Sequence, residues 1–256
     1  MKKYFKIFQV SILQYFAYRL SFVLWRLRNV FNLLLIYFLW SGVFGNNQTV
    51  FSYTHDKITT YILLLNIISA IVLSTRTTNI ASDILTGDII NFLLRPISFF
   101  KTIITTELSD KTINLTFSII EITLLIFLLN LNIFIQTNIL NYIFFIIAIF
   151  IGASISFFIN LSLSFIAFWT PEVWAPRFIY FILINFLAGS FFPLDILPKP
   201  IYELFLITPF PYLIFLPIKI YLNGFTWQLV QPLIIGGVWV IVLYYFSRKM
   251  WAKGIK

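Results

Sequence analysis

The chain has 256 residues, of which 60% are apolar and only 11% are charged, and its formal net charge is +9. A soluble domain usually takes about a quarter of its residues from the charged types, so this composition excludes an ordinary soluble protein. The sequence contains no cysteine, which excludes disulfides and thiolate metal sites within the chain.

The apolar residues stand in long runs, a pattern that is typical of membrane-spanning helices. A helix needs roughly 20 apolar residues to cross a hydrocarbon core of about 30 Å. The strands of a membrane β-barrel would be about 10 residues long with alternating polar and apolar positions, and the sequence lacks that pattern. We therefore expect an all-α polytopic membrane protein.

Residues 1–29 are apolar but are interrupted by polar side chains, among them Arg19, Arg26 and Arg28. This pattern predicts an N-terminal interfacial amphipathic helix whose basic residues lie at the lipid headgroups. The alternative is a span over residues 7–25, which would place an arginine in mid-bilayer at a cost of about 3 kcal/mol or more. We favour the interfacial helix.

Six spans are predicted in the remaining part of the chain, residues 30–256. In chain order they are Val30–Phe44, Ile58–Ser74, Ile113–Phe134, Ile139–Phe168, Phe178–Leu194 and Trp227–Phe246. A polar stretch, residues 75–112, separates the second span from the third. The segment before the sixth span is rich in proline and aromatic residues, so it is too apolar for a free loop and too broken for a plain span.

Most lysine and arginine residues fall on one side of the membrane when the amino terminus is placed in the cytoplasm. The inner segments are then 1–29, 75–112, 169–177 and 247–256, and the outer segments keep only Lys57, Lys199 and Lys219. Fifteen of the 18 basic residues are thus cytoplasmic, which is a strong positive-inside bias. We expect a multi-pass protein of the inner (plasma) membrane with both termini in the cytoplasm. The bias also explains the net charge without nucleic acid.

The long cytoplasmic stretch contains a segment, residues 80–98, that could bind another protein. Ser82 is a candidate helix N-cap, and Gly87 interrupts what would otherwise be a short helix. Arg95 and Pro96 end the apolar cluster within residues 89–94, because a residue before proline avoids the helical conformation. The charged residues that such a helix would expose are Asp83, Asp88 and Arg95. The alternative is a loop that only connects two spans.

Two runs of the sequence resemble ABC-2-type permeases, the membrane subunits of ATP-driven exporters. The first is Ala-Ser-Asp-Ile-Leu-Thr-Gly-Asp-Ile at 81–89, followed by Leu-Leu-Arg-Pro-Ile-Ser at 93–98. Thr86 stands where the family more often carries a glutamate. The second is Leu-Ala-Gly-Ser-Phe-Phe-Pro-Leu-Asp-Ile-Leu-Pro at 187–198, followed by Thr-Pro-Phe-Pro-Tyr at 208–212. The resemblance covers nearly the whole chain in order and spacing.

The resemblance implies a dimer of six-span subunits, either identical or paired with a similar permease, carried on two cytoplasmic ATPase subunits. ATP and Mg²⁺ would bind to those partners. It also implies short re-entrant helices within residues 190–226. The ATPase-coupling surface would comprise Asp83, Thr86, Gly87, Asp88, Arg95 and Pro96, and the outer gate Gly189, Phe192, Pro193, Asp195, Pro209 and Phe210. This chain should bind no cofactor itself, since it lacks the Gly-x-x-x-x-Gly-Lys-Ser/Thr run that cradles phosphates.

Two polar residues within the spans are candidates for a substrate pathway. Glu121 is the one acid predicted in mid-membrane, where a carboxyl group is costly and therefore a functional candidate. It could attract a cationic or amphipathic substrate or carry a proton; alternatively, it joins helices together with Asn114 and Ser118. Asn160 belongs to a stripe of small and polar residues in the fourth span, which favours helix packing over a polar pathway lining.

These observations predict a transport subunit rather than an enzyme. We expect the permease of an ATP-driven exporter that moves a small amphipathic or cationic compound out of the cytoplasm by alternating access. A lipid or lipid-linked glycan exporter of the same architecture is an alternative. An ion-coupled carrier should show inverted repeats and helix breaks at the midplane. An intramembrane enzyme or metal site would need paired acids or histidines, and Glu121 is alone.

Overall fold

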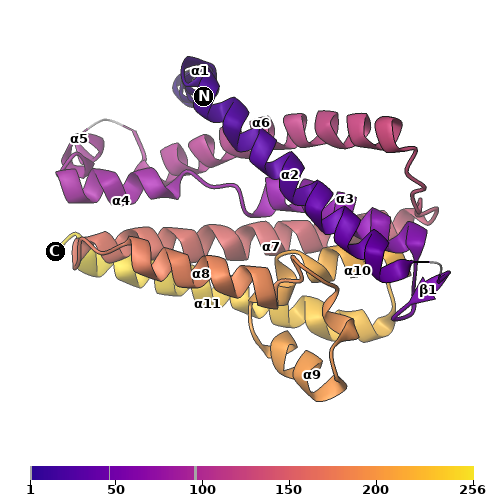
Figure 1. The fold of residues 1–256 in the computed structure, drawn as a ribbon. Helices are drawn as coiled ribbons and strands as arrows, with labels where there is room; N and C mark the ends of the chain where they lie inside the picture. The colour runs from indigo at the N-terminus through magenta and orange to yellow at the C-terminus, as the bar shows by residue number, and fades with distance from the viewer. Residues whose placement is uncertain (1, 46, 95–96) are drawn as a thin grey trace.

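Helices dominate the part of the chain that the structure, a computed structural model, describes: residues 2–45, 47–94 and 97–256 (Figure 1). The α-helices are α1 (Lys2–Ala17), α2 (Arg19–Phe44), α3 (His55–Val72), α4 (Thr77–Thr86), α5 (Ile89–Leu93), α6 (Phe99–Leu129), α7 (Ile139–Phe165), α8 (Trp174–Leu187), α9 (Lys199–Ile207), α10 (Phe215–Asn223) and α11 (Val230–Gly254). Short 3-10 helices are η1 (Ile166–Phe168), η2 (Leu194–Ile196), η3 (Phe210–Tyr212) and η4 (Trp227–Leu229). Strands β1 (Thr49–Val50) and β2 (Tyr53–Thr54) form an antiparallel hairpin.

Five helical stretches of the described residues are long and apolar enough to cross a membrane, which confirms the prediction of an all-helical membrane protein. They are Arg19–Phe44, His55–Thr86, Phe99–Leu129, Ile139–Phe168 and Val230–Gly254. The predicted fifth span corresponds to α8, which is apolar but has only 14 residues. An α-helix of that length reaches about 21 Å, less than the thickness of a hydrocarbon core.

The first helix break lies at Tyr18, eleven positions before the predicted boundary at residue 29. Arg26 and Arg28 therefore lie on α2, the first long helix, rather than on the N-terminal helix α1. Arginine lowers hydropathy but favours helix formation, and α2 has no proline or glycine before Gly42. Hydropathy thus suggested a boundary at a point where the backbone continues as a helix.

Most of the polar stretch 75–112 is helical, because α4, α5 and the first part of α6 occupy it. Ser82 lies in the middle of α4, so its prediction as an N-cap was wrong; the helix begins at Thr77. The predicted break at Gly87 is confirmed. Gly87 ends α4 with φ of 81°, a left-handed conformation that glycine adopts without steric cost.

Two of the segments that the charge pattern assigned to the cytoplasm, the stretch with α4 and α5 and the C-terminal segment, lie at the same end of the molecule, whereas α1 lies at the top of the view (Figure 1). In Figure 1, α4, α5 and the C-terminus lie together at the left, which we term the C-terminal end. The β1–β2 hairpin and the connection between α6 and α7 lie at the opposite end, which we term the hairpin end. Helices α7 and α11 pack side by side along the molecule and run in the same direction.

The most deeply buried part of the protein is the proline- and aromatic-rich segment before the last long helix. Residues 212–215, where η3 meets α10, have no exposed surface, and α10 packs against α3 and α7. A glycine of α7 allows this approach: a Cβ atom on Gly152 would lie 2.6 Å from the carbonyl oxygen of Tyr212. In contrast, α9 has no buried residue and protrudes from the bundle (Figure 1).

Candidate functional site

The bend between α4 and α5 carries four residues of the predicted ATPase-coupling surface. Asp88 accepts hydrogen bonds from the hydroxyl of Thr86 at 2.8 Å and from the side-chain amide of Asn91 at 3.3 Å. Thr86, Gly87 and Asp88 are exposed, and Asp83 is partly exposed on the preceding turn. The structure therefore brings these residues together on one surface of the C-terminal end. Two further predicted residues, Arg95 and Pro96, lie outside the described residues.

The link between α3 and α4, residues 73–76, is clamped by side chains of α6. The Glu107 carboxylate accepts hydrogen bonds from the hydroxyl of Thr75 at 2.8 Å and from the backbone N–H of Arg76 at 2.7 Å. The Lys111 ammonium donates to the carbonyl oxygens of Ile71 at 2.7 Å and Ser74 at 2.9 Å. A lysine at this place satisfies and neutralises the free carbonyls at the end of α3.

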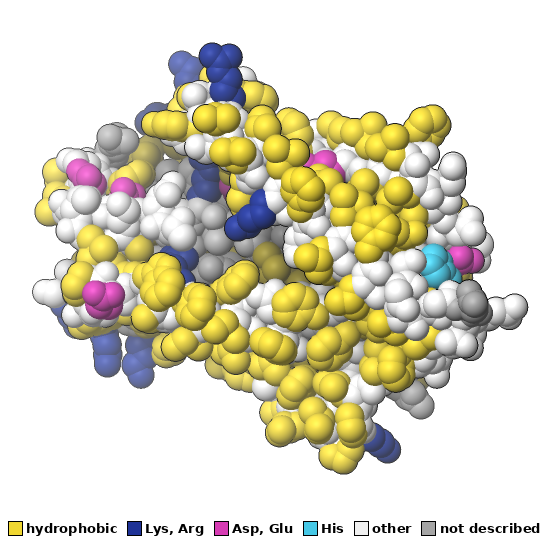
Figure 2. Space-filling view, viewed as in Figure 1, with side chains coloured by type: hydrophobic (Ala, Val, Ile, Leu, Met, Phe, Trp, Pro, Cys, Tyr) yellow, Lys and Arg dark blue, Asp and Glu magenta, His cyan; other side chains and the backbone are white. Residues whose placement is uncertain are grey.

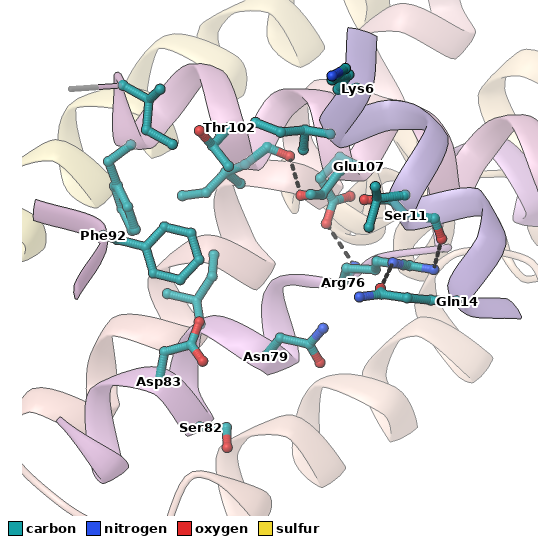
Figure 3. A pocket seen from close by; sticks show the side chains of 17 residues that line it. Lys6, Ser11, Gln14, Arg76, Asn79, Ser82, Asp83, Phe92, Thr102 and Glu107 are labelled. Carbon is teal, nitrogen blue, oxygen red and sulfur yellow. Dashed lines mark hydrogen bonds between the residues drawn. The ribbon is translucent and has the colours of Figure 1, made fainter. Parts of the chain in front are cut away.

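The side chain of Arg76 ties α1 to the same link (Figure 3). Its guanidinium donates to the side-chain oxygen of Gln14 and to the carbonyl oxygen of Ser11, both at 2.9 Å, and lies 3.4 Å from the Asp110 carboxylate. The hydroxyl of Tyr15 also donates to Asp110. Helices α1, α3, α4 and α6 are thus joined at one point by charged and polar side chains.

A cavity of about 590 Å³ lies beside this link, between α1, α4, α5 and α6 (Figure 3). Its polar lining includes Lys6, Gln14, Asn79, Asp83 and Glu107. This cavity, which we term the notch, is large enough to receive side chains of another protein.

A second cavity, of about 460 Å³, lies between α2, α3 and α8. Each of these helices presents to it a stripe of residues three and four positions apart, which is one face of an α-helix. The stripe of α2 is Trp25, Arg28, Asn29, Asn32, Leu33 and Ile36; that of α8 is Arg177, Tyr180, Phe181, Ile184 and Asn185. Figure 2 shows the molecule hollowed between α2 and α8, with basic side chains around the hollow.

Hydropathy does not reveal the arginines of this cavity. It places Arg28 on an interfacial helix, and Arg177 of the α8 stripe falls before the predicted fifth span. The polar positions of α2 and α8 nevertheless repeat at helical spacing, and that periodicity was a usable signal.

Of the two predicted pathway residues, the structure places one in the cavity and pairs the other. Asn160 lines the cavity, and its side-chain amide donates to the carbonyl oxygen of Ser156 at 2.9 Å. Glu121 instead accepts two hydrogen bonds from Arg26, with 2.6 Å between Arg26 Nε and Glu121 Oε1. Arg26 Nη1 also reaches Asn114 at 3.4 Å. Glu121 therefore joins α6 to α2.

The predicted outer-gate residues lie at the hairpin end of this cavity. Asp195 accepts a hydrogen bond from the Tyr53 hydroxyl at 2.9 Å and pairs with Lys219 at 3.3 Å. Gly189, at φ of 81°, accepts a hydrogen bond from the Tyr61 hydroxyl at 2.6 Å. These contacts tie the segment after α8 to β2, α3 and α10.

The aromatic and proline residues of the predicted outer gate pack between the cavity and the short helices. The Phe210 ring lies 6.3 Å from the Tyr180 ring, which lines the cavity. Pro193 precedes η2 and Pro209 precedes η3, while Phe192 packs against the main core. The predicted outer-gate residues, which lie within residues 189–210, thus bound the cavity at the hairpin end.

A comparison with known protein families decides the class of the protein. A family model described as "ABC-2 family transporter protein" matches residues 30–256. The chain belongs to the ABC-2 transporter family. The match confirms the resemblance drawn from residues 81–98 and 187–212, and it identifies this ABC-2 protein as a multi-pass membrane component of a transporter rather than an enzyme. A search of curated proteins found no match.

The residues that the structure describes in this ABC-2 protein hold no group of three or more potential metal ligands. Two acids of α6 are instead engaged with other segments: Glu107 accepts hydrogen bonds from Thr75 and Arg76, and Asp110 pairs with Arg76.

Proposed function

We propose that this chain is the membrane-spanning subunit of an ATP-driven exporter, which moves a small amphipathic compound out of the cytoplasm by alternating access. ABC-2 permeases generally pair with ATPase subunits. Two cytoplasmic ATPase subunits would supply ATP and Mg²⁺, and a second permease chain, identical or similar, would complete the pathway. The C-terminal end would face the cytoplasm.

The clamped link between α3 and α4 is the observation that carries this proposal. Helix α4 and the exposed bend at Gly87 project from the C-terminal end, whereas α3 lines the cavity between α2 and α8. Because Glu107 and Lys111 bind both sides of the link, a force applied to the bend is transmitted to α3 rather than absorbed by a loose connection. The notch between α1 and α4 would receive the ATPase.

The contacts of the hairpin end would hold the outer side closed in this state. Opening the cavity outward requires the segment after α8 to separate from β2 and α10. The Tyr53–Asp195–Lys219 contacts and the Tyr61–Gly189 hydrogen bond would then break. Such polar contacts can exchange for contacts with water, which suits a gate better than a fully apolar seal would.

The paired state of Glu121 bears on the substrate. The sequence suggested a cationic compound because Glu121 stood alone in an apolar span. Arg26 neutralises that carboxylate by a two-point ion pair, so it offers no free negative charge to a cation. The amphipathic character of the substrate rests instead on the mixture of amide and aromatic side chains in the cavity.

Co-purification tests the proposal. Tagged protein should bring down a nucleotide-binding chain, and Asp88→Lys should remove it, because the substitution reverses the charge of the exposed bend. Glu203→Lys makes the same change on the protruding helix α9, away from the C-terminal end, and should retain the partner (Figure 1). An absent ATPase, or labelling of residues 83–88 from outside the cell, would overturn the proposal.

A further inference from the structure

The cavity between α2, α3 and α8 carries an excess of positive charge. Its lining includes Arg26, Arg28 and Arg177 but no aspartate or glutamate. Arg26 is neutralised by Glu121. Among the described residues no carboxylate lies within 4 Å of Arg28 or Arg177, so two unmatched guanidinium groups face one cavity.

These guanidinium groups keep free hydrogen-bond donors. Arg177 donates from Nη2 to the Ser164 hydroxyl at 2.7 Å, which uses one of the five N–H groups of its side chain. Arg28 is exposed and stands on the same face of α2 as Asn29 and Asn32. A guanidinium binds carboxylate, sulfonate and phosphate oxygens in a two-point geometry that a neutral amide cannot match.

The aromatic ring of Tyr180 lines the cavity beside these arginines. Tyr180 follows Arg177 by three positions, so both side chains face the cavity from α8. Its hydroxyl is buried beside Ser156 and Asn160, behind the cavity wall. The donors that the cavity offers to an anion are therefore the two guanidinium groups.

The remaining walls suit an apolar body attached to the anionic group. Trp25, Phe181 and Phe191 line the cavity, together with Leu33 and Ile36. Its volume of about 460 Å³ lies within the range of small-molecule sites. A compound with one charged group and a flat apolar part would therefore match both halves of the lining.

We infer that this cavity binds an amphipathic compound through an anionic group, a carboxylate, sulfonate or phosphate ester, held by Arg28 and Arg177. The inference rests on the proposed transport function and names the substrate class of that site. A cation would meet two like charges and no free acid. The same chemistry occurs in a free amphipathic anion and in an anionic lipid headgroup.

Binding of two dyes that differ only in charge tests the inference. Dansyl-taurine carries a sulfonate and dansylcholine a quaternary ammonium on the same fluorophore. The complex with its ATPase, in phosphatidylcholine nanodiscs, should bind dansyl-taurine more tightly. The double variant Arg28→Gln/Arg177→Gln should weaken dansyl-taurine binding by about tenfold or more, since two charge-assisted contacts are lost, and should not weaken dansylcholine binding.

A matched control separates loss of the site from a general effect of lost positive charge. Lys249→Gln/Lys253→Gln removes two exposed positive charges of α11 outside the cavity and should leave dansyl-taurine binding unchanged. The inference is overturned if wild-type protein prefers dansylcholine, or if Arg28→Gln/Arg177→Gln, eluting as an intact complex, binds dansyl-taurine as wild type does.

The source of the anion is decided by adding phosphatidylglycerol to the nanodiscs. Arginine-dependent competition with dansyl-taurine would identify a lipid headgroup as the occupant, and its absence would identify a free compound; both outcomes support the shared chemistry. ATP-driven uptake into inverted vesicles is measured separately. Arginine-dependent binding without ATP-driven uptake would sink the exporter proposal alone, whereas ATP-driven uptake of dansylcholine that ignores both arginines would sink this inference alone.

Discussion

Arg26 on α2 and Glu121 on α6, 95 positions apart in the sequence, form a two-point ion pair that joins the two helices. Both side chains are largely buried, with exposed fractions of 9% and 13%. Each charge is tolerable in an apolar span because the other compensates it. The pair therefore fixes α2 against α6 beside the cavity.

Removing one partner of this pair should destabilise the protein. Glu121→Leu leaves the Arg26 cation buried without a counter-charge, and we expect a loss of about 3 kcal/mol. The double variant Arg26→Leu/Glu121→Leu removes both charges and should regain most of that loss. Thermal unfolding in detergent measures both variants. A single variant as stable as wild type would show that the pair contributes nothing.

The sequence predicted the features that depend on neighbouring residues. Long apolar runs predicted a helical membrane protein, and Gly87 predicted the break after α4 because a glycine tolerates the left-handed backbone there. Proline and aromatic density predicted that residues 195–226 are neither a loop nor a span. Short helices η3 and α10 occupy the core in that segment.

Features that depend on contacts between distant segments could not be read from the sequence. Arg26 lowered the hydropathy of its window and shifted the predicted boundary of the first span, although its charge is cancelled by Glu121, far along the chain. The clamp on the α3–α4 link likewise joins Arg76 to Gln14 and Glu107, 62 and 31 positions away. Hydropathy scores each residue alone, so it cannot detect such compensation.

Gly87→Ala should weaken binding of the ATPase without unfolding the protein. A Cβ atom at this position would meet nothing within 4 Å, so the cost arises only from the left-handed backbone, at about 1 kcal/mol. That cost falls on the exposed bend, and we expect affinity for the ATPase to fall about fivefold. Titration of the purified partner measures the change.

The matched control for this experiment is Gly237→Ala in α11. A Cβ atom there also meets nothing within 4 Å, and the backbone is helical, so alanine should be neutral or slightly stabilising. Gly87→Asn should be milder than Gly87→Ala, since asparagine tolerates the left-handed conformation better. Equal affinity for Gly87→Ala and Gly237→Ala would contradict the role of the bend.

Gly152→Ala should be destabilising for a steric reason. The new methyl group would lie 2.6 Å from the carbonyl oxygen of Tyr212 and 3.2 Å from that of Leu213, so the backbone between η3 and α10 must shift. Overpacking of this kind costs about 1 to 3 kcal/mol. The unfolding temperature should fall relative to Gly237→Ala, and an unchanged value would show that η3 can move freely away from α7.

Tyr53 should give the protein a stability that is lost at alkaline pH. Burial of its phenol, with the Asp195 carboxylate as a further cause, raises the pKa of Tyr53 well above its ordinary value. The folded protein therefore keeps this proton at a pH where the unfolded chain, with an ordinary tyrosine pKa of 10.0, has lost it. By linkage, the stability that Tyr53 contributes is fully present below that pH and declines above it.

Tyr53→Phe removes this titration and the hydrogen bond to Asp195, which keeps its ion pair with Lys219. At neutral pH we expect the variant to lose about 1 kcal/mol of stability. Unfolding temperatures of both proteins, measured from about pH 8 to about pH 11, should converge at the alkaline end, because wild type declines more steeply once unfolded tyrosine ionises. Parallel curves would contradict this prediction. They would mean that the phenol of Tyr53 has the same pKa in the folded and unfolded chains.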